Sequence, residues 1–104
     1  MPLDMRKVIK CLISPNLRYF RKYIRNSSKI TICSPLKLFI SLQINPDDYL
    51  LSPMAKIDLT AFQKAIIQVL VNQRFVANKE QFIEIGIHKV KSKKSEIMVF
   101  IQEE

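Results

Sequence analysis

Four basic side chains and two tyrosines recur at short intervals between residues 16 and 26. The bases are Arg18, Arg21, Lys22 and Arg25, and the tyrosines are Tyr19 and Tyr23. Clustered arginine and lysine bind a phosphate backbone because they displace its condensed counterions, and arginine grips phosphate through paired hydrogen bonds. Tyrosine rings stack on unpaired bases. This set of residues therefore predicts contacts to nucleic-acid phosphates, with stacking by the tyrosines as a supplement.

The positive charge of the chain is concentrated in its first third. The formal net charge is +8, and residues 1–30 hold eight basic residues against one acid, Asp4. Surface helices usually mix both signs, so ordinary solvation does not account for the near absence of acids. Three other partners fit the same composition: an acidic protein, an anionic membrane surface, or an organelle import system that recognises a basic presequence.

A second basic run lies near the C-terminus, where Lys91, Lys93 and Lys94 occur within four residues. These lysines are predicted as secondary phosphate contacts if they share a face with the first cluster. The alternative is a solvated loop whose lysines discourage pairing between sheet edges.

The residues that enzymes use for catalysis are scarce. The chain has a single histidine, His88, and a single glycine, Gly86, which cannot build a glycine-rich phosphate loop. His88 would need an orienting acid and a nearby nucleophile, and Glu84 and Glu96 supply only carboxylates. The adjacent pair Asp47–Asp48 is typical of a turn. We therefore expect no catalytic residues and no enzymatic activity.

Metal and cofactor sites are not expected either. The two cysteines, Cys11 and Cys33, are too few and too far apart for a zinc site or a disulfide framework, so they are predicted to be buried, reduced thiols. Reduced thiols and the lack of a signal-like apolar segment favour a cytoplasmic location. No apolar run approaches the length of about 20 residues that a membrane span needs.

Helices are expected to carry the basic cluster and much of the core. Residues 3–13 have Met5, Val8, Ile9 and Leu12 at helical spacing. Residues 16–26 predict a clearer helix. At about 100° per residue, its apolar side chains lie opposite its charged ones.

The strongest helical pattern covers residues 59–74, with Asp58 as the N-cap. Its main apolar stripe predicts packing on a sheet. Ile67 and Val71 lie off that stripe and predict a second covered side, either a homodimer interface or a contact with helix 3–13.

Strands are expected over residues 29–33 and 36–44, and over residues 82–90 and 96–102. The last two are predicted to form an antiparallel hairpin around residues 91–95. The sequence thus predicts a small single-domain α+β fold: a mainly antiparallel four-stranded sheet with one principal helix packed on it. A basic helical N-terminal region (1–28) would precede an α+β core (29–104). Residues 54 onward also resemble a unit of their own, which would make the basic region an appendage. The strand order is not predicted.

From these features we expect a small basic accessory protein that binds RNA or DNA, mainly through backbone phosphates. The alternatives are a protein-interaction or regulatory subunit, possibly homodimeric, and an organelle-targeted protein with a basic presequence.

Overall fold

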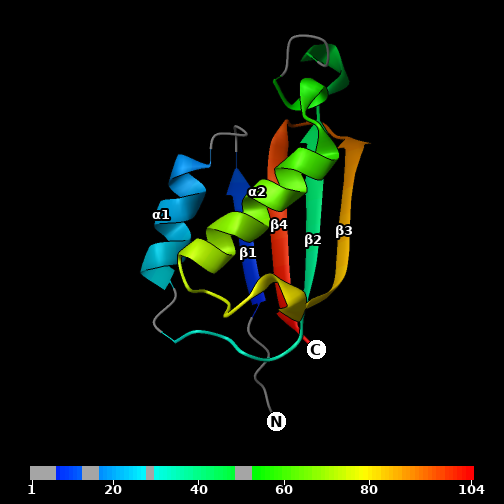
Figure 1. The fold of residues 1–104 in the computed structure, drawn as a ribbon. Helices are drawn as coiled ribbons and strands as arrows, with labels where there is room; N and C mark the ends of the chain where they lie inside the picture. The colour runs from blue at the N-terminus through cyan, green and yellow to red at the C-terminus, as the bar shows by residue number, and fades with distance from the viewer. Residues whose placement is uncertain (1–6, 13–16, 28–29, 49–52) are drawn as a thin grey trace.

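A mixed sheet lies beneath two helices in the computed structural model of the chain (Figure 1). The structure describes residues 7–12, 17–27, 30–48 and 53–104. Its helices and strands, in chain order, are β1 (Lys7–Leu12), α1 (Arg18–Ser27), β2 (Leu36–Ile44), α2 (Leu59–Asn72), β3 (Phe82–Lys91) and β4 (Glu96–Glu103). The strand order across the sheet is β1-β4-β2-β3. Both helices cover the same face of the sheet.

Strand β2 is one of the two inner strands of the sheet, together with β4. It runs parallel to β3 on one side and antiparallel to β4 on the other. Every second residue of β2 points toward the helices and is buried, from Leu36 to Ile44. This period of two is the signature of a strand with one face in a core. The buried side chains of α2 belong to the same core cluster: Phe62, Ile66, Val69 and Leu70.

Helix α2 begins where the sequence predicts. The Asp58 carboxylate accepts hydrogen bonds from the backbone N–H groups of Thr60 at 3.0 Å and Ala61 at 3.4 Å. These are donors that an uncapped helix leaves unsatisfied. Just past the end of the helix, Arg74 adopts a left-handed backbone with φ of 58°. Glycine usually takes such a position.

The predicted hairpin is wrong. Strands β3 and β4 are both present, but β2 lies between them and pairs with each. Crossing one strand requires about 10 Å, which is within reach of a four-residue connection. The connection is tied to the end of β2: the Ser92 N–H donates to the Ile44 carbonyl oxygen at 3.0 Å, and the Asn45 N–H donates to Ser95 Oγ at 3.0 Å.

Two further predictions fail near the N-terminus. Residues 7–12 of the predicted helix 3–13 form strand β1, which pairs antiparallel with β4; the other residues of that helix lie outside the described ranges. The predicted strand 29–33 is replaced, in its described part, by a single bridge between Ile32 and Val76. Thus three of the four predicted strands are found, and the sheet is mixed because β2 and β3 are parallel.

The coarse prediction of a small single-domain α+β fold is confirmed. Helix α1 shares its core, because Phe20 and Ile24 are fully buried in the same cluster as the inward side chains of β2 and β4. The basic helix is therefore held against the rest of the fold by apolar burial.

The Gln81 side chain connects the segment between α1 and β2 to the residues that follow α2 through hydrogen bonds. Its Nε2 donates to the carbonyl oxygens of Ile32 at 2.8 Å and Ser34 at 3.0 Å. Its Oε1 accepts from the N–H groups of Ala77 at 2.7 Å and Asn78 at 2.9 Å. One side chain thus satisfies four backbone groups that no strand or helix serves.

We predict that Gln81→Ala lowers the free energy of unfolding by about 1–3 kcal/mol, since partly buried backbone groups lose their partners. Each 1 kcal/mol lowers Tm by roughly 4–8 °C in a domain of this size. Thermal unfolding followed by circular dichroism measures the shift. Gln68→Ala is the matched control, because Gln68 is exposed and its Nε2 donates to Oδ1 of the exposed Asn72 at 2.8 Å. Equal losses in the two variants would contradict the assigned role of Gln81.

Candidate functional site

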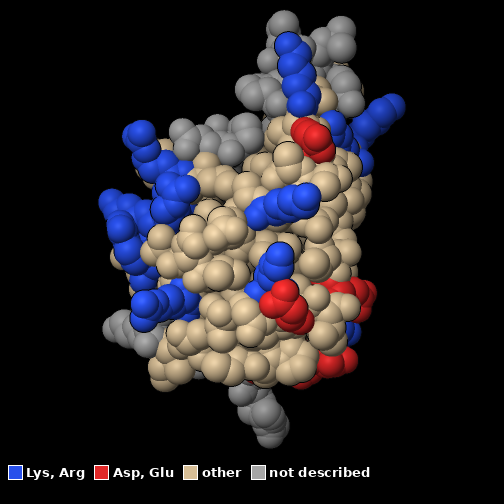
Figure 2. All heavy atoms as spheres, in the orientation of Figure 1, with Lys and Arg blue, Asp and Glu red and all other residues tan. Residues whose placement is uncertain are grey.

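The exposed side of α1 carries the four bases that the sequence singles out. Arg18, Arg21, Lys22 and Arg25 are all exposed, and we call this set the basic face of α1. The helix contains no Asp or Glu. In Figure 2 the charged side chains over α1 are all blue, whereas most of the red ones lie toward the β3 side of the molecule. The first cluster is therefore a continuous cationic surface.

The spacing of residues along α1 explains this separation. Phe20 and Ile24 are four residues apart, which places them on the same side of a helix, and both are fully buried. Leu17 and Tyr23 flank them and pack partly against the core. The four bases occupy positions of α1 that are exposed to solvent. Arg25 also lies in the last turn, where a positive charge interacts favourably with the helix dipole.

The two tyrosines differ in their surroundings. Tyr19 is 70% exposed beside the basic face, so its ring is accessible for stacking. Tyr23 is half-buried and packs against the core cluster. The structure therefore leaves Tyr19 as the more accessible of the two predicted stacking residues.

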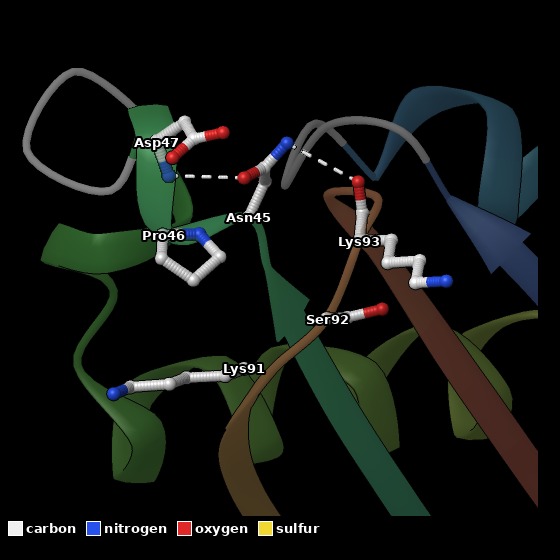
Figure 3. Close-up of a pocket in the computed structure, with 6 residues that line it drawn as sticks. All are labelled: Asn45, Pro46, Asp47, Lys91, Ser92 and Lys93. Carbon is white, nitrogen blue, oxygen red and sulfur yellow. Dashed lines mark hydrogen bonds between the residues drawn. The ribbon is translucent and has the colours of Figure 1, made fainter.

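The second group of predicted bases lies at the end of the sheet where β2 and β3 finish. Lys91, Lys93 and Lys94 are exposed there. A shallow concavity of about 480 Å³ opens at this end (Figure 3). Its lining residues are Asn45, Pro46, Asp47, Lys91, Ser92 and Lys93.

Backbone contacts shape this concavity. Asn45 Nδ2 donates to the Lys93 carbonyl oxygen at 3.1 Å, and the Asp47 N–H donates to Asn45 Oδ1 at 2.9 Å. The side chains of Lys91 and Lys93 extend in different directions, and the Asp47 carboxylate lies on the opposite wall (Figure 3). The two ammonium groups therefore do not converge on one phosphate, and these lysines are suited to separate, secondary contacts.

The two basic regions lie on separate elements of the fold. Helix α1 covers the β1 side of the helical layer, while the β3–β4 connection lies at the end of the sheet.

Ile67 and Val71, the predicted protein interface, are both half-buried on α2 and pack against the core cluster. Helices α1 and α2 contact each other. Only part of each side chain is left for a partner.

The residues considered for catalysis do not come together. His88 is exposed on β3, opposite Ser41 of β2, whereas Glu96 pairs with Gln43 on the far side of β2. The interposed strand separates His88 from Glu96. Across the described parts of the chain, no group of three or more His, Cys, Asp or Glu side chains is placed to hold a metal ion.

The prediction that Cys33 is buried is wrong, because Cys33 is a free thiol at an exposed position. Cys11 is the other cysteine predicted to be buried, and its side chain is not among those that the structure describes. No helix in the described ranges has the length and apolar character to cross a membrane.

Comparison with known proteins adds no relative: no protein-family model matches the chain, and no curated protein matches it. Function must therefore be inferred from its own side chains.

Sequence reasoning missed two surfaces. One is the face of the sheet opposite the helices, where Phe39 of β2 pairs with Phe100 of β4. The other is the free edge of β3, where Ile83, Ile85 and Val90 are exposed. The alternation in 36–44 contains a signal for the first, since Phe39 occupies a position on the side opposite the buried residues. The second depends on strand order, which the sequence alone does not give.

Proposed function

We propose that the protein binds RNA or DNA through backbone phosphates, with the basic face of α1 as the primary contact surface. The observation that carries the proposal is the set of four exposed bases on a helix without acids, docked through two fully buried side chains. A docked helix presents its charges in a fixed arrangement, so less conformational entropy is lost when they engage a ligand.

The expected mode of binding follows from the residue types. Three of the four bases are arginine, which binds phosphate oxygens in pairs. Phosphate contacts carry no base sequence, so we expect weak sequence preference. Tyr19, exposed beside these bases, adds stacking where a base is unpaired. Lys91, Lys93 and Lys94 are proposed as secondary contacts for longer ligands.

The packing of α1 favours this role over that of a cleaved presequence. Phe20 and Ile24 contribute to the same core as the sheet, and removal of α1 would uncover part of that core. A targeting segment has no need of such packing.

Fluorescence anisotropy with short single- and double-stranded RNA and DNA, across a salt series, tests the proposal. Four phosphate contacts predict a slope of log K against log salt of about −3 for single strands and about −4 for duplex DNA. We expect binding that persists at physiological salt and differs between the ligands. Binding that vanishes well below that salt, equally for every ligand, would reduce the basic face to a generic charged surface.

A further inference from the structure

Strand β3 ends the sheet on the side away from α1. It pairs with β2 alone, and in Figure 1 no described element lies beyond it. The strand is ten residues long. Its outer backbone N–H and C=O groups therefore have no neighbouring strand within the described chain. Natural proteins usually protect such an edge with lysine, proline, a bulge or a short strand.

The protection on β3 is confined to its two ends. The register with β2 shifts between Leu36 and Lys37, which marks an irregularity at the start of β3, and Lys89 and Lys91 lie near its finish. Residues 84–88 between them contain neither lysine nor proline. A central segment of regular, accessible strand thus remains.

Apolar side chains are exposed along the same strand. Ile83 is 53% exposed, Ile85 37% and Val90 39%, so three of the five exposed large apolar side chains of the described chain belong to β3. Ile85 lies on the same face of the sheet as Leu38, and Val90 lies on the opposite face, beside Gln43. Apolar side chains therefore flank the edge of β3 on both faces, where an added strand would cover part of them.

The sequence of this segment is complementary to itself when two copies run antiparallel. Pairing centred on Gly86 places Glu84 of one copy opposite His88 of the other, and Ile85 opposite Ile87, each pair occurring twice. Carboxylate–imidazole and aliphatic pairs are both favourable between directly opposite residues. At the centre, Gly86 has no side chain, and a Cβ there would lie 3.1 Å from Cδ1 of Phe39. The glycine thus leaves room for the Phe39 ring within its own chain and adds no side chain at the centre of the proposed pairing.

Charge also favours a second copy at this edge. A chain with net charge +8 repels its own kind, but the basic face of α1 lies toward the opposite edge of the sheet. Joining two copies through β3 keeps the two cationic surfaces far apart. At the joined edge, Glu84, which lies 3.7 Å from Lys37 Nζ of its own chain, faces His88 of the other copy, and Ile85 faces Ile87.

We propose that the protein forms a homodimer in which β3 strands pair antiparallel about Gly86 and join two sheets into one of eight strands. The two-fold axis runs perpendicular to the sheet, so the helices of both copies lie on the same side. The dimer thereby presents two basic faces on that side.

Sedimentation equilibrium over a wide protein concentration range, without nucleic acid, tests this proposal. We expect a monomer–dimer equilibrium for the unmodified protein. His88→Glu sets a second carboxylate against Glu84 at each of two positions and is expected to weaken the dimer roughly tenfold. His88→Lys, at the same exposed position, is expected to retain or strengthen it. Ile85→Lys introduces an edge lysine and is expected to leave a monomer.

Gln68→Glu, a change on the exposed side of α2, serves as the charge control and is expected to leave the equilibrium unchanged. Circular dichroism confirms that each variant is folded. A monomer at every concentration would overturn the proposal. So would a dimer that responds equally to His88→Glu and His88→Lys, or one that Ile67→Lys on α2 dissociates while Ile85→Lys does not. Failure here leaves nucleic-acid binding by the monomer untouched, since no nucleic acid is present.

Discussion

Replacing the basic face of α1 by glutamine is expected to abolish nucleic-acid binding at physiological salt. The variant carries Arg18→Gln, Arg21→Gln, Lys22→Gln and Arg25→Gln and removes four of the charges that make the net +8. If each base neutralises one phosphate, the slope of log K against log salt falls in magnitude by roughly 3. Glutamine is a good helix former, so α1 should remain folded. Anisotropy titrations at several salt concentrations measure both effects.

A control with the same net charge separates a local site from general attraction. Lys56, Lys64, Arg74 and Lys79 are exposed outside α1, and changing all four to glutamine removes the same number of charges. This control should retain most of the affinity at physiological salt. The triple change Lys91→Gln, Lys93→Gln and Lys94→Gln should weaken binding by less than the α1 variant. Equal losses in the α1 and control variants would refute the assignment to α1.

Truncation of the buried aromatic of α1 is expected to be the most damaging single change to stability. Phe20 is fully buried in the core, and Phe→Ala at such sites costs about 3–5 kcal/mol through lost burial and the cavity left behind. This is a large share of the 5–15 kcal/mol by which typical domains are stable. Urea or thermal unfolding of Phe20→Ala measures the loss.

The neighbouring aromatic provides the matched control. Tyr19 is 70% exposed, so Tyr19→Ala should change the free energy of unfolding by no more than about 0.5 kcal/mol. The two variants remove aromatic rings at adjacent positions of one helix, and only one ring lies in the core. Similar, small losses in both would show that α1 is an appendage and not part of the folded domain.

Elements with long, periodic patterns were predictable from the sequence. Helix α1 was predictable because its apolar and charged residues lie on opposite sides at helical spacing. Helix α2 was predictable because a capping residue, Asp58, precedes a continuous apolar stripe. The strand formed by residues 7–12 was not predictable from the sequence. A short apolar run such as Val8 and Ile9 fits either a helix or a strand, and pairing with β4 decides between them.

The predicted hairpin of β3 and β4 was the main failure, and its cause is non-local. The short connection after β3 suggested a hairpin, yet four residues suffice to cross the end of β2. A helix between two strands is typical of a parallel crossover, and β2, α2 and β3 form one. The alternation along β2 indicates one buried face, but it does not say which strands pair with its two edges, and those partners are β3 and β4.

The candidate site was predictable in part. The exposure of the four bases followed from helix geometry once α1 formed. The half-burial of Tyr23, the divergence of Lys91 and Lys93, and the free edge of β3 depend on tertiary packing and were not predictable. His88 shows the same limit, because its separation from Glu96 follows from the position of β2.

The central claim is that the basic face of α1 binds nucleic acid. An NMR titration of the nitrogen-isotope-labelled protein with a short oligonucleotide, at physiological ionic strength, tests this claim most directly. Binding through the basic face predicts that the largest amide shift changes fall on α1 and the loops beside it, with smaller changes at the β3–β4 connection for longer ligands. Amide chemical shifts that stay unchanged at saturating ligand would contradict the assignment of nucleic-acid binding to α1. So would chemical-shift changes confined to β3 or to the sheet face opposite the helices.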